Sequence, residues 1–150
     1  MLLDAAAADS NKGGPRVADA VANGKTRFAG ALVVDDEGGL QMLVKAILEH
    51  GAYLVDVAKD GLEACQRVRA TRYDAIICDI FMPNMDGLTF YQKLRDIDRN
   101  QADRVIFVTG ADLEDDIVRA VRECGRPVLR KPFEIDEFSR TVDSVAGGEL

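Results

Sequence analysis

Polar side chains able to support phosphoryl or metal chemistry stand at the ends of four short apolar runs. In chain order they are Asp35 and Asp36, Asp79, Thr109, and Lys131. Carboxylates gathered in one place repel one another unless a cation neutralises them, and Mg²⁺ or Mn²⁺ prefers such hard oxygen ligands. A divalent cation, an ammonium and a hydroxyl would together neutralise the oxygens of a transferring phosphoryl group. A carboxylate among them could act as a nucleophile and form an acyl phosphate.

Asp79 is the best candidate for that nucleophile. It ends an apolar run over residues 74–79 and precedes the turn-rich segment 80–87, which reads IFMPNMDG. Proline and an Asp-Gly pair favour a tight loop whose backbone groups face the site. A single strand-end carboxylate is often only a helix N-cap. The joint occurrence of reactive side chains at four strand ends favours the chemical interpretation.

The elements that must position these residues alternate regularly along the chain. Strands are expected over 31–35, 53–58, 74–79, 104–110 and 127–131, and helices over 40–50, 61–70, 88–99, 113–124 and 135–145. This alternation predicts an α/β fold, a doubly wound parallel sheet of five strands between two helical layers, as a three-layer sandwich. In such sheets the reactive crevice lies at the carboxyl ends of the strands, so the polar side chains are expected to meet there.

Composition supports one soluble globular domain. The 150 residues include 47% hydrophobic types, and 19 Lys and Arg against 26 Asp and Glu give a net charge of −7. This charge argues against nucleic acid and anionic membranes as partners. No apolar run approaches the roughly 20 residues of a membrane-spanning helix. Three widely spaced cysteines, at 65, 78 and 124, fit a reducing cytoplasm, so a cytoplasmic location is expected.

Two regions differ in composition. Residues 1–28 are rich in Ala, Gly, Asn and Asp and are expected to form a flexible N-terminal tail or linker. Residues 29–147 carry the regular alternation of strands and helices and are expected to form the folded domain.

The chain from residue 29 to residue 146 resembles a response-regulator receiver domain of two-component signalling, which implies a flavodoxin-like (βα)5 fold. The resemblance rests on VVDDE at 33–37, DIFMPNMDG at 79–87, Thr109-Gly110 and KPF at 131–133. It implies that the chain is a phosphorylation-dependent switch or relay station rather than an enzyme with an external substrate. A free-standing receiver and a receiver within a larger protein, such as a hybrid sensor kinase, both stay open.

The resemblance implies specific partners for the carboxylates. Asp79 would accept the phosphoryl group of a phosphohistidine, on a sensor histidine kinase or a histidine phosphotransfer protein. Asp36 and Asp79 would bind Mg²⁺ directly, Asp35 mostly through water, and Phe81 through its backbone carbonyl.

It also implies how the phosphoryl group is held. Lys131 would pair with the nucleophile and later with the phosphoryl group, and Thr109 would swing toward a phosphoryl oxygen. The backbone N–H groups of Phe81 and Gly110 would assist. A cis bond between Lys131 and Pro132 is implied as well, and only X-Pro bonds adopt cis readily.

Three positions depart from the usual family pattern. Val128 stands where many receivers have an aromatic switch residue, and a β-branched side chain has no ring to rotate. We therefore expect the segment 110–126 to shift as a backbone unit, or the domain to serve mainly in phosphoryl relay. Phe81 and Ala111 flank the site and cannot orient a water molecule, so slow loss of the phosphoryl group is expected.

An enzyme that forms an aspartyl phosphate while hydrolysing or transferring the phosphoryl group of a small molecule is the alternative from another class. Such enzymes usually carry a second acid two residues after the nucleophile, where this chain has Phe81. A flavin or nucleotide carrier on the same fold would need a phosphate-binding glycine loop after Val34, where two carboxylates would instead repel an anion.

Overall fold

The computed structural model describes residues 17, 29–112 and 114–147. The predicted tail over 1–28 lies outside the described residues, apart from Val17. Within the described ranges, five strands and six helices alternate along the chain. The alternation of strands and helices that the apolar runs predict is therefore present in the fold.

The strands form one parallel sheet. They are β1 (Ala29–Val34), β2 (Tyr53–Ala58), β3 (Ala75–Asp79), β4 (Val105–Thr109) and β5 (Val128–Arg130), in the spatial order β2-β1-β3-β4-β5. β1 and β3 lie side by side, with Val34 opposite Cys78. Their carboxyl ends therefore bring the residues that follow β1 next to the end of β3.

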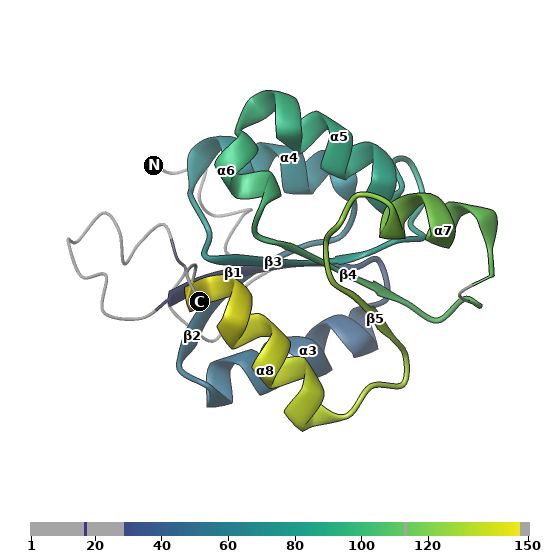
Figure 1. Cartoon of the computed structure of the whole chain (residues 1–150). Helices are drawn as coiled ribbons and strands as arrows, with labels where there is room; N and C mark the ends of the chain where they lie inside the picture. The colour runs from purple at the N-terminus through teal and green to yellow at the C-terminus, as the bar shows by residue number, and fades with distance from the viewer. Residues whose placement is uncertain (1–16, 18–28, 113, 148–150) are drawn as a thin grey trace.

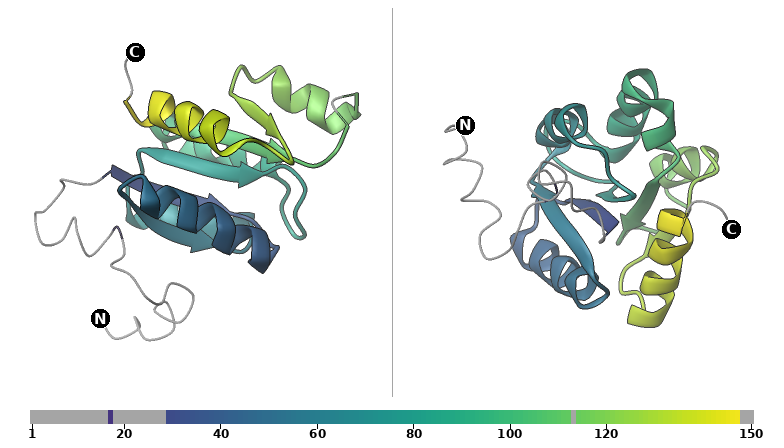
Figure 2. Two further views of the ribbon diagram at one scale, coloured as in Figure 1. Left: turned by 90° about the horizontal axis from the view of Figure 1, so that it is seen from below. Right: turned by 90° about the vertical axis from the view of Figure 1, so that its left-hand side faces the viewer.

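Helices cover both faces of the sheet. They are α3 (Gly38–His50), α4 (Gly61–Ala70), α5 (Gly87–Ile97), α6 (Arg99–Ala102), α7 (Asp116–Arg122) and α8 (Ile135–Gly147). α4, α5, α6 and α7 lie on one face, while α3 and α8 lie on the other (Figure 1). Figure 2 shows α3 and α8 crossing the lower face of the sheet. The three-layer, doubly wound α/β fold predicted from the sequence is confirmed.

Each face has its own apolar core because successive strand residues point to opposite sides. Leu32 and Val34 belong to the core under α4, α5 and α7, while Ala31 and Val33 belong to the core under α3 and α8. Cys78 is fully buried in the first of these cores. Two closed cores fix both faces of the sheet, so the strand ends provide a rigid base for the site.

Several helix boundaries differ from the prediction by one to three residues, and side-chain caps explain two of them. The helix expected over 88–99 ends at Ile97, and Asp98 is extended and starts the separate helix α6 by accepting the N–H of Asn100 at 3.0 Å. The helix expected over 113–124 begins only at Asp116. Asp115 accounts for this start because its carboxylate accepts backbone N–H groups of the first turn. In both cases a local side-chain cap overrides the apolar spacing.

Candidate functional site

Three carboxylates meet at the carboxyl edge of the sheet. Asp35 and Asp36 follow β1, and Asp79 ends β3. One oxygen from each residue lies within 4.8 Å of the others. Asp35 and Asp79 are buried, whereas Asp36 is exposed. The structure thus brings together all three carboxylates named from the sequence, in a cluster open to solvent on one side.

Lys131 places its ammonium group beside two of these carboxylates. Its Nζ lies 3.3 Å from Oδ2 of Asp79 and 3.9 Å from Oδ2 of Asp35. Lys131 follows β5, its backbone N–H donates to the carbonyl of Thr109 at 2.7 Å, and its bond to Pro132 is cis. The backbone of Lys131 is therefore attached to the end of β4, and its ammonium group contacts both buried carboxylates.

Backbone N–H groups hold the two buried carboxylates in place. Glu37 donates its N–H to Oδ1 of Asp35 at 2.8 Å, and Phe81 donates its N–H to Oδ1 of Asp79 at 3.2 Å. The two oxygens of Asp79 therefore have different partners: Oδ2 accepts from Lys131, and Oδ1 accepts from Phe81. Phe81 itself is 40% exposed.

Thr109 lies at the end of β4 and is fully buried. Its Oγ1 accepts the N–H of Ala111 at 3.0 Å, so its hydroxyl proton stays available for donation. Gly110 is exposed between them. Val128 is half-buried opposite Phe107, whose ring makes an edge contact with Tyr91 at 5.7 Å between ring centres.

Two features set the electrostatics of the cluster: its carboxylates are partly buried, and three of them lie near the single ammonium group of Lys131. Burial raises the pKa of Asp35 from 3.8 to about 6; the N–H of Glu37 opposes this rise and the charge of Asp79 adds to it. Burial also raises the pKa of Asp79, against the lowering effect of Lys131. One ammonium therefore leaves the carboxylates incompletely neutralised. Three clustered carboxylates with this excess charge suit a hard divalent cation such as Mg²⁺.

We expect Asp35 to make the metal-free protein more stable as the pH falls from about 7 to about 4. Between 3.8 and about 6, the folded state holds a proton on Asp35 that the unfolded chain has released. The free energy of unfolding therefore rises as the pH falls through 6, and this contribution is complete below the unfolded pKa. Asp35→Asn should abolish this part of the pH dependence and add up to about 3 kcal/mol of stability at neutral pH.

Urea titrations in a chelating buffer at several pH values would measure the free energy of unfolding of the native protein and of Asp35→Asn. The difference between the two values at each pH is the effect of Asp35. Asp103→Asn, at an exposed carboxylate, provides the matched control and should follow the native curve. If the free energies of unfolding of the native protein and of Asp35→Asn differed by the same amount at every pH in this range, the prediction would be wrong.

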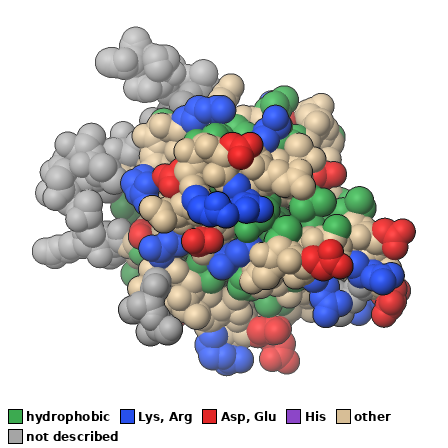
Figure 3. Space-filling view, turned by 45° about the horizontal axis from the view of Figure 1, so that its top comes forward, with side chains coloured by type: hydrophobic (Ala, Val, Ile, Leu, Met, Phe, Trp, Pro, Cys, Tyr) green, Lys and Arg blue, Asp and Glu red, His purple; other side chains and the backbone are tan. Residues whose placement is uncertain are grey.

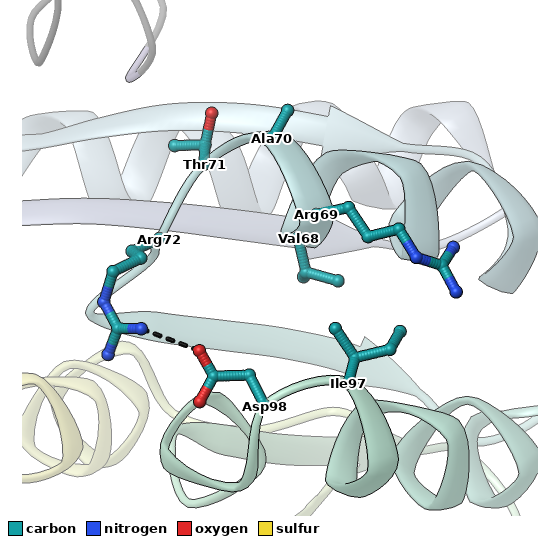
Figure 4. A pocket seen from close by; sticks show the side chains of 7 residues that line it. All are labelled: Val68, Arg69, Ala70, Thr71, Arg72, Ile97 and Asp98. Atoms are coloured by element: carbon teal, nitrogen blue, oxygen red, sulfur yellow. Dashed lines mark hydrogen bonds and ion pairs between the residues drawn. The ribbon is translucent and has the colours of Figure 1, made fainter.

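A separate groove of about 300 Å³ lies at the opposite end of the molecule. It is lined by the end of α4, the residues that follow it, and Ile97 and Asp98 (Figure 4). Arg72 pairs with Asp98 at 2.7 Å across this groove. Lys and Arg side chains lie interspersed with Asp and Glu on the face turned toward the viewer in Figure 3. Because α4 begins at the carboxyl edge of the sheet and ends at the groove, this groove is distinct from the carboxylate cluster.

Comparison with known proteins identifies the family. The model of the response regulator receiver domain matches residues 31–143. The chain is 37% identical over 112 residues to response regulator Rre1 of Synechocystis, which covers 74% of this chain and 48% of that protein. It is 33% identical over 112 residues to sporulation initiation phosphotransferase F of Bacillus subtilis, covering 74% of this chain and 88% of the relative.

Solved structures agree with this assignment. The receiver domain of a sensor histidine kinase from Pseudomonas aeruginosa, with a magnesium ion coordinated in its active-site cleft, superposes with a TM-score of 0.72. That match is 28% identical and covers 81% of this chain and 99% of the solved one. The chain belongs to the response regulator receiver domain family of two-component signalling. Receiver domains are signalling switch domains.

The similarity to Rre1 covers only part of that relative. The chain spans about half of Rre1, 48% of its length, so the activities of that whole protein do not carry over. Among the described residues, none of the helices is long and apolar enough to cross a membrane.

Sequence reasoning missed Asp60, although the structure attaches it to the loop that follows β3. Asn84 of that loop donates its side-chain amide to Asp60 at 3.2 Å. The only sequence signal was the pair Asp60-Gly61 directly before a helical segment, which indicates a helix start and nothing about the site.

Proposed function

We propose that this receiver domain takes a phosphoryl group from a phosphohistidine onto Asp79, in a reaction that needs Mg²⁺. The donor would be a sensor histidine kinase or a histidine phosphotransfer protein, and the phosphorylated domain would switch a downstream partner or relay the group. One observation carries the proposal: the Asp79 carboxylate lies between the Lys131 ammonium and the Phe81 N–H, inside a cluster of carboxylates.

The residues present fit a divalent cation. Asp36 and Asp79 would bind Mg²⁺, or Mn²⁺, directly, with Asp35 acting mostly through water and the carbonyl of Phe81 completing the protein ligands. When bound, the ion supplies the positive charge that neutralises the carboxylates and the oxygens of the incoming phosphoryl group. Burial raises the pKa of Asp35 and of Asp79, and a bound divalent cation would favour their charged forms as Lys131 already does.

The chain's own groups account for the remaining chemistry. A carboxylate oxygen of Asp79 forms a bond to phosphorus as the phosphorus–nitrogen bond of the donor breaks, and the leaving imidazole keeps the bonding electrons. Lys131 is already within reach of Asp79 and would follow the charge onto the phosphoryl oxygens. Thr109 would donate its free hydroxyl proton, while Phe81 and Gly110 would donate their backbone N–H groups.

The test is intact mass after incubation with Mg²⁺ and a small acyl phosphate, followed by peptide mapping. We expect a single phosphoryl adduct at Asp79 that does not form when Mg²⁺ is chelated. An adduct mapped to another residue, or one that forms equally without Mg²⁺, would overturn the proposal. If the acyl phosphate gives no adduct, the same assay with a phosphorylated histidine phosphotransfer protein decides the matter.

Loss of the phosphoryl group is expected to be slow and to accelerate in the double variant Phe81→Asn, Ala111→Glu. Both native side chains are apolar, so neither can hydrogen-bond and orient an attacking water. Polar side chains at both positions should increase the hydrolysis rate by roughly tenfold, since orientation of water is part of the barrier. The decay of the adduct mass measures this rate.

Phe81→Leu is the control, because it changes the side chain but supplies no polar group. Its decay rate should stay near the native value. Equal decay rates for the native protein and the double variant would refute the role of these two side chains.

We also propose that the signal leaves the site without rotation of an aromatic side chain at position 128. Val128 is β-branched and half-buried beside Phe107. The segment 110–126 would instead move as a backbone unit, or the domain would mainly pass the phosphoryl group onward. Superposition of structures with and without a phosphoryl mimic tests the backbone version, which fails if this segment does not move.

We place the domain in the cytoplasm. Cys65, Cys78 and Cys124 are free thiols, and the first two are buried. Thiols that stay reduced are typical of a reducing compartment.

A further inference from the structure

The outer part of the β3–α5 loop, residues 80–86, is attached to the start of α4. Asn84 donates its side-chain N–H to Oδ2 of Asp60 at 3.2 Å. Met85 packs against Gly61, where an added Cβ would lie 2.9 Å from the Cβ of Met85. The loop that follows the phosphoacceptor strand therefore has one polar and one apolar contact with a different helix.

Asp60 is itself held firmly. It is buried, and its Oδ1 accepts the N–H of Glu63 at 2.9 Å as the N-cap of α4. The Glu63 side chain in turn accepts the N–H of Lys59 at 2.7 Å. One carboxylate thus caps a helix with one oxygen and binds Asn84 with the other. Asn84 is attached to a group with little freedom to move.

The loop backbone at Asn84 is strained and needs such support. Its φ is +69°, in the left-handed region that L-residues rarely adopt. The N–H of Met85 donates to the carbonyl of Pro83 at 2.7 Å, so residues 83–85 form a γ-turn with a positive φ at its centre. That form is strained and persists only where its surroundings hold it.

A backbone hydrogen bond joins the two ends of the loop next to Asp79. Gly87 donates its N–H to the carbonyl of Ile80 at 2.8 Å. Phe81 lies between this closure and the turn at Asn84, and its N–H reaches Asp79 at 3.2 Å. Only Met82 and Pro83 separate Phe81 from Asn84 in the chain, so a change in the backbone at Asn84 also alters the backbone at Phe81.

We propose that Asp60 is a positioning residue for phosphoryl transfer: through Asn84 it holds the β3–α5 loop so that the backbone of Phe81 faces Asp79. This inference rests on the proposed function, in which the N–H and carbonyl of Phe81 serve the phosphoryl group and the cation. Its physical basis is preorganisation, since a loop held in one conformation presents its donors without first being ordered.

Two variants separate positioning from helix capping. Asp60→Ser keeps an oxygen that can cap α4 but is shorter than the carboxylate that reaches Asn84. Asn84→Gly keeps the left-handed backbone and removes the amide donor. In the metal-free protein, both should speed amide hydrogen exchange at Phe81 and Met85. Both should also slow Mg²⁺-dependent phosphoryl uptake by roughly three- to tenfold, and the double variant should be no slower than the slower single variant.

Asp98→Ser is the matched control. Asp98 likewise caps a helix, through the N–H of Asn100, and binds a side chain from another segment, Arg72, but it lies at the opposite end of the molecule. This variant should leave exchange at Phe81 and the rate of uptake at their native values. Thermal unfolding of each variant verifies that the measurements are made on folded protein.

Failure of this inference is distinguishable from failure of the proposed function. If the native protein gains its adduct at Asp79, but Asp60→Ser and Asn84→Gly show native exchange at Phe81 and a native rate, Asp60 is only a helix cap and the inference is overturned. If the native protein gains no adduct from any donor, the proposed function fails. Exchange at Phe81 in the metal-free variants then still decides whether Asp60 positions the loop.

Discussion

The Asp79→Asn variant is expected to take up no phosphoryl group while folding as well as the native domain. A carboxamide has nearly the shape of a carboxylate but lacks the nucleophilic oxygen. Its carbonyl oxygen can still accept the N–H of Phe81. Since burial raises the pKa of Asp79, removing this charge should leave the metal-free domain at least as stable at neutral pH. Intact mass measures the uptake, and urea unfolding measures the stability.

The matched control is Asp36→Asn, which changes an exposed carboxylate of the same cluster. This variant should still gain the adduct but should need a higher Mg²⁺ concentration, because it loses a proposed Mg²⁺ ligand rather than the proposed acceptor. A phosphoryl adduct of native yield on Asp79→Asn would show that another residue is the acceptor.

The fold could be predicted from the sequence because its signals are local and periodic. The apolar runs that became β1 and β3 are buried on both faces of the sheet, as expected of parallel strands. The breaks between helices were harder to place. Asp98 and Asp115 lie within or next to segments whose apolar residues have helical spacing. The hydrogen bonds that their side chains accept fix the starts of α6 and α7, and these bonds cannot be read from the spacing.

The site could be predicted in part for a related reason. Parallel strands bring their carboxyl ends to one edge, so residues as distant as Asp35 and Lys131 were expected to lie together, and their side chains are 3.9 Å apart. The contact between Asp60 and Asn84 has no such rule behind it. It joins two loops 24 residues apart and depends on the left-handed turn at Asn84. Asparagine permits such a turn, but its presence does not predict Asp60 as the partner.

Gly87→Ala is expected to destabilise the domain by about 2 kcal/mol and to slow phosphoryl uptake. An added Cβ at this position would lie 2.6 Å from the carbonyl oxygen of Asp79 and 2.9 Å from the Cα of Ile80. Both are backbone atoms at the end of a central strand, so they cannot turn aside as a side chain would. The displaced backbone belongs to Asp79, the proposed acceptor, and the site should therefore lose its geometry together with the stability. Urea unfolding and the rate of adduct formation measure the two effects.

Two other glycines separate this contact from the general effect of replacing glycine. An added Cβ at Gly39 in α3 or at Gly110 beside Thr109 would meet no atom within 4 Å. Gly39→Ala should raise stability by about 0.5 kcal/mol because alanine favours the helix, and Gly110→Ala should be nearly neutral. All three variants add the same methyl group, so the difference between Gly87→Ala and the other two isolates its collision with the backbone of β3. A Gly87→Ala variant as stable as Gly39→Ala would mean that the loop can move away from the strand freely. That freedom would be incompatible with a loop that holds Phe81 against Asp79.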